Sequence, residues 1–190
     1  MTNAVKAGRG LRYVFGLLAT IAVAACASAQ TENMIPQLSQ VALPTAASKT
    51  VRIVATAPTV LGYDALVIPG EPPPQSQITA EAFREALRRT LEESELFKSV
   101  QMQGNTDYEL HGLIFSQQIT NGWHYSGTIG VRYKLIDTAS GKTKWQDSIV
   151  SDCYSDKNSI MGVSSTSDAT ECAMRKNLSQ LADKLSKLSL

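Results

Sequence analysis

The stretch Thr79–Val100, TAEAFREALRRTLEESELFKSV, predicts an amphipathic helix that leads directly into a strand. Its small and apolar side chains recur every three or four residues, which places them along one stripe of the helix. They are Phe83, Ala86, Leu87, Thr90, Leu91 and Ser94. Charged residues occupy the opposite face, and we expect that face to be solvated. Thr79 can cap the first turn. Leu96 and Phe97 are predicted to enter the core at the helix exit, before Val100 begins the strand.

Around this helix, the sequence predicts a sheet. β-branched residues indicate a strand over 51–57, and alternation of apolar and polar residues indicates strands over 107–117, 128–137 and 144–150. The last two form a hairpin through a turn at 138–141. A bulge is expected after Gly112, where the outer face of its strand becomes apolar. The proline-rich loop 59–77 precedes the helix, and residues 65–68 within it are apolar enough for a short edge strand.

The C-terminal third is predicted to hold a serine-rich mobile loop over 151–170, followed by a last helix. Asp168 is the expected cap of that helix, with Glu171 three residues later as in a capping box. The helix has an apolar stripe of Met174, Leu178, Leu181, Leu185 and Leu188. The predicted fold class is therefore α+β, with two helices packed on one face of a mostly antiparallel sheet of about four to five strands.

The first 25 residues have the features of a secretory signal peptide. Residues 1–12 carry three positive charges and no acidic residue, and 13–25 form an uncharged, mostly apolar run that is short for a bilayer span. The small residues Val23-Ala24-Ala25 precede Cys26, and this pattern resembles the lipobox of bacterial lipoproteins. The resemblance implies that Cys26 becomes an acylated N-terminus, with palmitate as the expected fatty acid. Ala27, by the rules of that family, implies the outer membrane.

A second cleavage site competes with this interpretation. Ala27-Ser28-Ala29 fits an ordinary A-x-A signal-peptidase site. Cleavage after Ala29 would discard Cys26 and release a soluble periplasmic protein.

The sequence thus divides into three parts: a lipoprotein signal peptide over 1–25, a flexible tether over 26–49 that starts at lipidated Cys26, and a single α/β periplasmic domain over 50–190. The tether assignment rests on a polar stretch with Pro36 and Pro44 and without a clear period. In the alternative, a short segment of this stretch docks on the domain through Met34, Ile35, Leu38 and Val41.

Cys153 and Cys172 are predicted to form a disulfide, because the leader places both outside the cytoplasm, where disulfides persist. The bridge would stabilise the fold by about 3 kcal/mol on the loop-entropy model.

Charge and histidine content bear on cofactors and partners. The chain has 18 basic and 17 acidic residues, and without the three cations of the leader it would carry a formal charge of −2. We therefore expect no nucleic-acid partner. His111 and His124 have no second ligand at metal-binding spacing, so we expect no metal and no cofactor. Trp123, His124 and Tyr125 are a candidate partner contact in a turn; alternatively, Trp123 covers the edge of the core.

These segments together resemble a group of small bacterial envelope lipoproteins. The residues that carry the resemblance are Phe83-Arg84-Glu85-Ala86-Leu87, the helix exit 94–100, Asp107-Tyr108-Glu109-Leu110-His111-Gly112 and the hairpin from Val131 to Trp145. The group includes the ABC-transporter auxiliary lipoproteins and the penicillin-binding-protein activator lipoproteins, whose domains look like the N-terminal domain of the Tol-system propeller protein. Glu95 stands where such families usually have glycine, so we expect another kind of helix cap there.

The leading functional hypothesis is a non-enzymatic, membrane-anchored accessory or binding module of a bacterial envelope complex. The alternative is a soluble periplasmic ligand- or lipid-binding domain, with a cleft under the loops 59–77 and 151–170. An enzyme is the least favoured class, because the acidic group Asp152, Asp156 and Asp168 has no base or nucleophile placed beside it by the sequence.

Overall fold

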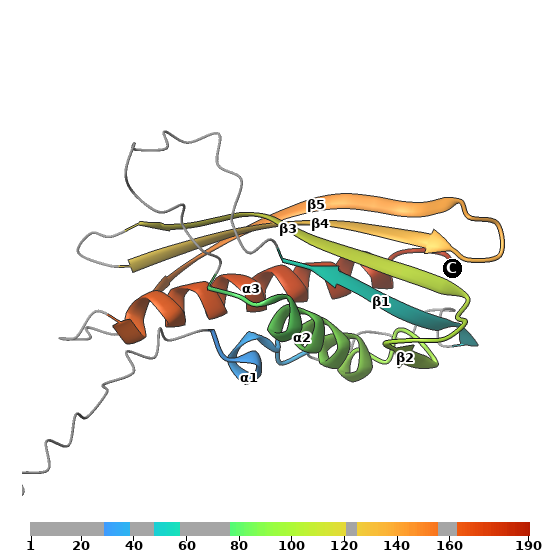
Figure 1. Cartoon of the computed structure of the whole chain (residues 1–190), viewed down its shortest axis with the longest axis horizontal. Helices are drawn as coiled ribbons and strands as arrows, with labels where there is room; N and C mark the ends of the chain where they lie inside the picture. The colour runs from blue at the N-terminus through green and yellow to red at the C-terminus, as the bar shows by residue number, and fades with distance from the viewer. Residues whose placement is uncertain (1–28, 39–47, 58–76, 121–124, 156–162) are drawn as a thin grey trace, which may run out of the picture.

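The computed structural model describes residues 29–38, 48–57, 77–120, 125–155 and 163–190, and within them five strands form one sheet with helices on one of its faces (Figure 1). The strands are β1 Thr50–Thr56, β2 Ser99–Gln101, β3 Tyr108–Thr120, β4 Tyr125–Asp137 and β5 Thr143–Ser155. The helices are α1 Thr31–Met34, α2 Ala80–Glu93 and α3 Val163–Ser186. The predicted α+β class is confirmed.

The sheet has the order β2-β1-β3-β4-β5. β1 pairs in parallel with β2 and β3, whereas the three long strands β3, β4 and β5 pair antiparallel. The parallel pairing of β1 and β3 requires a crossover connection, and α2 lies within it. The register of β3 against β4 shifts between Ile114 and Ser116, so the predicted bulge lies at Phe115, three residues beyond Gly112.

Helix α2 forms as its sequence pattern predicts. The hydroxyl of Thr79 accepts a hydrogen bond from the backbone N–H of Ala82 at 3.0 Å, which caps the first turn. The stripe of small and apolar residues is buried against the sheet, and Phe83, Leu87 and Leu91 are fully buried. Each such side chain contributes roughly 1.5–3 kcal/mol by leaving water. Leu96 and Phe97 enter the core at the helix exit, as predicted.

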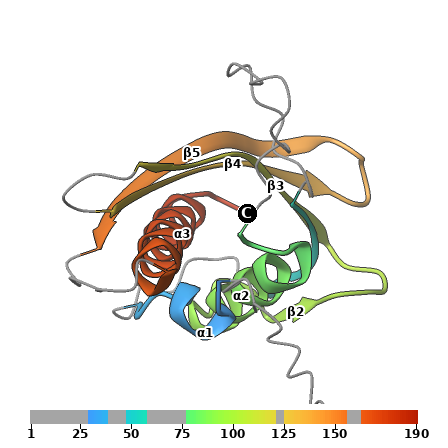
Figure 2. The same ribbon diagram turned by 60° about the vertical axis from the view of Figure 1, so that its left-hand side comes forward.

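Helix α3 crosses the concave face of the sheet beneath β4 and β5 (Figure 2). Its predicted stripe packs into the core, with Met174, Leu178 and Leu181 fully buried. The side chain of Asn177 joins the helix to two strands: it accepts a hydrogen bond from the Tyr133 hydroxyl at 2.8 Å and donates to the Ile149 carbonyl at 2.9 Å. Burial raises the pKa of Tyr133, so this hydroxyl stays a neutral donor.

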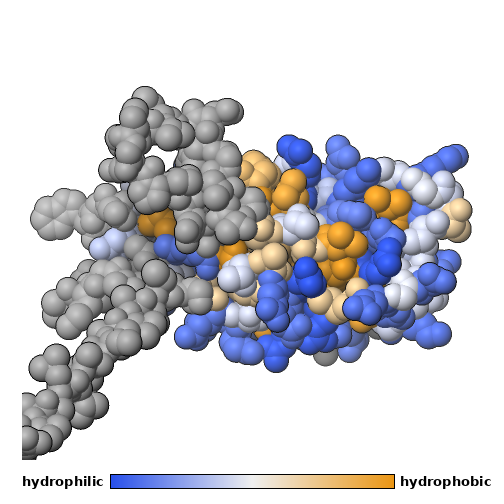
Figure 3. Space-filling model, in the orientation of Figure 1, coloured by the Kyte–Doolittle hydropathy of each residue, from blue (hydrophilic) through white to orange (hydrophobic). Residues whose placement is uncertain are grey.

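The opposite face of the sheet carries the polar and partly exposed residues of the strands. His111 lies there, as predicted, with its ring bonded to Glu109 at 3.0 Å. Four large apolar side chains are exposed in the described residues: Met102, Leu113, Val150 and Tyr154. In the view of Figure 3, the hydrophobic residues of the described surface form separate patches among hydrophilic ones.

The prediction of a loop over 151–170 is wrong at both of its ends. β5 continues to Ser155, because Ser151, Cys153 and Ser155 alternate inward and are buried under α3. Their small size and polarity hid the alternation in the sequence. Helix α3 begins at Val163, so Asp168 lies inside the helix and is not its cap.

The backbone conformation at the end of α2 also differs from expectation. Glu95 adopts the left-handed conformation that glycine usually takes after a helix, with φ at 52°. The helix therefore ends with the usual left-handed residue, but here that residue is a glutamate, which has a Cβ, and not a glycine.

Candidate functional site

Two polar features connect segments that are far apart in the sequence, and both are candidates for a functional site. We call the first the N-terminal junction, formed by residues 29–34, Gln77, Glu171 and Arg175. We call the second the polar crease. It is lined by residues of three segments: 49–52 at the start of β1, 104–109 before and at the start of β3, and 137–139 at the β4–β5 turn.

The N-terminal junction begins at Ala29, which is buried, with 6% of its surface exposed. The backbone N–H of Ala29 donates to the carbonyl of Gln77 at 3.1 Å. Met34, at the end of α1, is fully buried in the core between α2 and α3. The predicted flexible tether over 26–49 is therefore wrong for residues 29–38, and the alternative of a docked segment holds there. The burial of Ala29 and Met34 and the hydrogen bonds of this segment to Gln77, Glu171 and Arg175 together offset the conformational entropy that a free linker would keep.

Glu171 is the centre of this junction. Its carboxylate is buried and accepts hydrogen bonds from the Gln30 backbone N–H at 2.6 Å, the Asn33 side-chain amide at 2.7 Å and the Ser167 hydroxyl at 3.1 Å. Arg175, one turn further along α3, donates from Nε to the Asn33 carbonyl at 2.7 Å. These bonds replace the water that a buried carboxylate loses.

A second helix also holds α1. Arg89 on α2 forms an ion pair with Glu32 on α1, and its charge is shared with Glu85 on its own helix at 3.6 Å. Residues 30–33 are thus bonded to both α2 and α3. The sequence pattern does not reveal these contacts. Glu171 fits a local capping box by its spacing from Asp168, whereas its partner Gln30 is 141 positions away.

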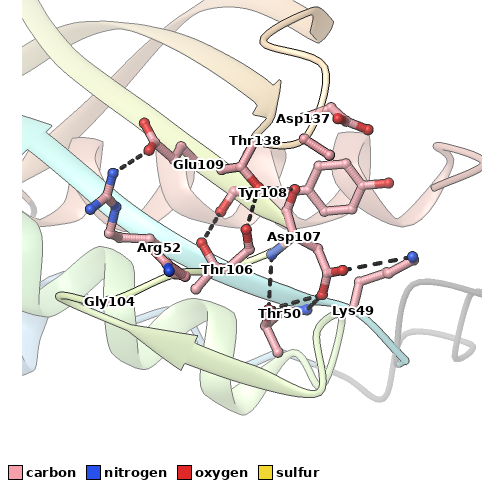
Figure 4. Close-up of a pocket in the computed structure, with 12 residues that line it drawn as sticks. Lys49, Thr50, Arg52, Gly104, Thr106, Asp107, Tyr108, Glu109, Asp137 and Thr138 are labelled. Atoms are coloured by element: carbon pink, nitrogen blue, oxygen red, sulfur yellow. Dashed lines mark hydrogen bonds and ion pairs between the residues drawn. The ribbon is translucent and has the colours of Figure 1, made fainter.

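The polar crease is an open depression of about 610 Å³ at the end of the sheet where β1 and β3 begin. Figure 4 shows that side chains from β1, from the connection between β2 and β3, and from the β4–β5 turn surround it. The sequence pattern does not reveal this depression, because its lining residues come from three segments far apart in the chain, 49–52, 104–109 and 137–139.

Hydrogen bonds within the polar crease tie these segments to one another. Asp107 accepts from the backbone N–H of Thr50 at 2.8 Å and from the Thr50 hydroxyl at 2.9 Å. The Thr138 hydroxyl donates to backbone carbonyls of the chain segment that precedes β3, among them Asp107 at 2.8 Å. Arg52 and Glu109, which also line the crease, form an ion pair.

The carboxylates of the crease are held in the charged form. Two hydrogen bonds from Thr50 lower the pKa of Asp107, with a smaller effect of Lys49 at 3.8 Å. The hydrogen bond from His111 lowers the pKa of Glu109, and Arg52 adds to this. The hydrogen bonds and ion pair of Asp107 and Glu109 clamp the start of β3 to β1.

The predicted site residues fall in different places. Cys26, Trp123, His124 and Asp156 lie outside the described residues, as does the predicted loop 59–77 except for Gln77. Tyr125 is the first residue of β4 and is half-buried. The predicted disulfide between Cys153 and Cys172 is present, with a Cα–Cα distance of 5.7 Å, and it joins the end of β5 to α3.

Across the described residues, no group of three or more His, Cys, Asp and Glu side chains is arranged to hold a metal ion. None of the helices in the described ranges has the length and apolar character needed to cross a membrane.

No protein-family model matches the chain, and no curated protein matches it. Among solved structures, the chain is similar to protein XCC0632 from Xanthomonas campestris, described with the family model DUF330, with a TM-score of 0.59 and 14% identity over 80% of this chain and 93% of that chain. It is also similar to the hypothetical protein CT253 from Chlamydia trachomatis, with a TM-score of 0.50 and 12% identity over 73% of this chain and 96% of that chain.

A weaker similarity links the chain to lipoprotein GNA1162 from Neisseria meningitidis. The TM-score is 0.37, with 12% identity over 60% of this chain and 90% of that chain. At these identities the first two similarities define a shared fold, and the third is too low to define even that.

Proposed function

We propose that this chain is a non-enzymatic lipoprotein, anchored through acylated Cys26 in the outer membrane, whose periplasmic domain serves as an accessory or binding module of an envelope complex. The observation that carries the anchor is the burial of Ala29. A mature protein that began at Gln30 would lack a residue of its own core and the hydrogen bond to Gln77. A mature protein that begins at Cys26 keeps both.

The leader sequence supports the same start of the mature chain. The small residues before Cys26 complete a lipobox after a basic segment and an apolar run, whereas the competing site after Ala29 cuts into the packed junction. More than one acyl chain on the cysteine would give stable membrane attachment.

The non-enzymatic character rests on how the polar groups are used. The carboxylates with shifted pKa values, Glu85, Asp107, Glu109, Asp137 and Asp147, are all shifted downward by hydrogen bonds and ion pairs within the fold. Their arrangement serves to hold elements together, which is the use expected of a rigid binding domain.

The test is the intact mass of the mature protein purified from envelopes of a Gram-negative bacterium that produces the full chain. We expect added acyl mass on a chain that starts at Cys26, and we expect the Cys26→Ser variant to lose this mass and leave the membrane fraction. A mature chain without acyl mass that starts at Gln30 would overturn the anchor and favour the soluble alternative.

The accessory role needs a separate measurement. Crosslinking of the tagged chain in its own envelope, followed by purification, should recover one defined membrane complex, and the Cys26→Ala variant should lose it although its domain is folded. Full function of a secreted, unanchored form in a deletion strain would contradict this role.

A further inference from the structure

The N-terminal junction leaves very little free chain between the domain and the proposed lipid anchor. Cys26 precedes the buried Ala29 by three residues, and three residues span at most about 10 Å. A flexible tether of 24 residues, as the sequence predicted, would have an average reach of roughly 27 Å and a much longer maximum. The docking of residues 29–34 therefore removes the reach that a linker would provide.

The junction also lies toward one end of the molecule. Ala29 bonds to Gln77, and the backbone N–H of Gln77 donates to the side chain of Gln117 at 3.3 Å, close to the end of β3. The polar crease contains Asp107 at the start of the same strand. Ten residues of strand separate Asp107 from Gln117, which is about 33 Å at the usual rise per residue. Figure 1 shows the same arrangement: the β4–β5 turn lies at the far right, and β3 ends on the left.

We infer that the domain sits directly on the lipid bilayer with the Ala29 end against the membrane surface, and that the polar crease is held at the far end, facing away from the membrane. This orientation rests on the proposed acylation of Cys26. In this orientation the Ala29 end of the domain contacts the bilayer. The crease and the β4–β5 turn then extend furthest into the periplasm.

Glu171 is the residue that fixes this orientation. Its carboxylate accepts hydrogen bonds from the backbone of Gln30 and from the side chain of Asn33. Unless these part-buried hydrogen bonds break, the free part of the chain is limited to the residues that precede Ala29. Loss of these bonds would lengthen the free chain by several residues and would let the domain tilt on its anchor.

The test measures distance from the membrane at two positions of the full acylated chain in liposomes. A fluorescent label is attached to Gln118→Cys, near the end of β3, or to Ser140→Cys, in the β4–β5 turn, and the lipids carry nitroxide quenchers at the headgroup. Both positions are exposed, and the native disulfide occupies the two other cysteines of the domain. We expect quenching at position 118 to be severalfold stronger than at position 140.

A spacer provides the matched control. About 12 Gly and Ser residues inserted between Ser28 and Ala29 add an average reach of roughly 19 Å. The spacer should remove most of the quenching at position 118 and abolish the difference between the two labels. The Glu171→Ala variant should shift the quenching in the same direction, whereas Asp183→Ala, which removes an exposed acidic group elsewhere on α3, should not.

The outcomes separate the orientation from the anchor. Acyl mass and flotation with the liposomes are measured first on every sample. An unacylated chain that does not float overturns the anchor and the orientation together. A chain that is acylated and floats, but whose two labels are quenched equally or whose position 140 is quenched more, overturns the orientation alone.

Discussion

At the scale of single residues, Glu95 is the position where the backbone and the side chain conflict. A residue with a Cβ loses about 1–2 kcal/mol in the left-handed conformation that Glu95 adopts after α2. The burial of Leu96 and Phe97, which follow Glu95 directly into the core, compensates for this strain.

Replacing Glu95 with glycine should therefore stabilise the protein. We expect Glu95→Gly to raise the free energy of unfolding by about 0.5–1 kcal/mol, since the relief of strain exceeds the added entropy of the unfolded chain. Urea denaturation of the mature protein measures this difference. Glu95→Ala is the matched control, because it removes the same charge and keeps the Cβ; a glycine variant no more stable than the alanine variant would contradict the argument.

At the scale of secondary-structure elements, Gly127 on β4 lies directly against the backbone of α3. A Cβ at this position would stand 2.7 Å from the Ala169 carbonyl oxygen and 2.8 Å from its carbon, which are backbone atoms of α3. The helix can therefore pack against β4 here only while residue 127 has no side chain.

Gly127→Ala should push α3 away from the sheet and cost about 1–3 kcal/mol of stability, because neither backbone can give way locally. Thermal and urea unfolding measure the loss. Gly112→Ala is a useful comparison, since the nearest atoms to its Cβ are Cζ and Cε1 at the far end of the Phe83 side chain, at 3.0 and 3.2 Å, and a side chain can shift where two backbones cannot. We expect a smaller loss there, and equal losses at both glycines would argue against a backbone contact as the cause.

Elements differed in how well the sequence predicted them. α2 and β4 were predictable, because their apolar residues follow the periods of helix and strand, and the turn at 138–141 indicated the hairpin with β5. The end of β5 was missed, because serine and cysteine at 151, 153 and 155 face the core. The start of α3 was missed for a related reason, since serine and threonine at its N-terminus suggest a loop.

The candidate sites were less predictable than the fold. The disulfide followed from two cysteines and the compartment, but the N-terminal junction and the polar crease depend on contacts between distant segments. Such contacts leave no local period in the sequence. Asp107 and Thr50 are 57 positions apart, and each looks like an ordinary polar residue at the end of a strand.

At the scale of the whole molecule, ion pairs and hydrogen-bonded carboxylates connect most of the elements. Lys184 on α3 lowers the pKa of Asp147 on β5, and hydrogen bonds and ion pairs likewise lower the pKa values of Asp107 and Glu109 in the polar crease. Each of these groups has a lower pKa in the folded than in the unfolded protein. Their stabilisation is therefore fully present above the unfolded values, 3.8 for aspartate and 4.5 for glutamate, and is lost as the pH falls through the folded values.

The protein should accordingly lose stability on acidification below about pH 4.5. We expect the free energy of unfolding, measured in urea at a series of pH values, to fall steadily below this point. Glu109→Gln should reduce the slope, and Glu93→Gln, which removes a charge from the exposed end of α2, controls for the change in net charge. An acid slope that is the same in both variants would show that Glu109 does not contribute to it.

For a chain that is exported and anchored as proposed above, the bond between Gln30 and Glu171 has a consequence for the order of events during export. The two residues are 141 positions apart, so the first packed segment of the domain cannot reach its partner until the last helix has emerged. A chain of this kind remains incomplete while it passes through a translocation channel, which requires an unfolded polypeptide. The closing contact that holds the domain beside its anchor is then among the last to form, after the whole chain has been delivered.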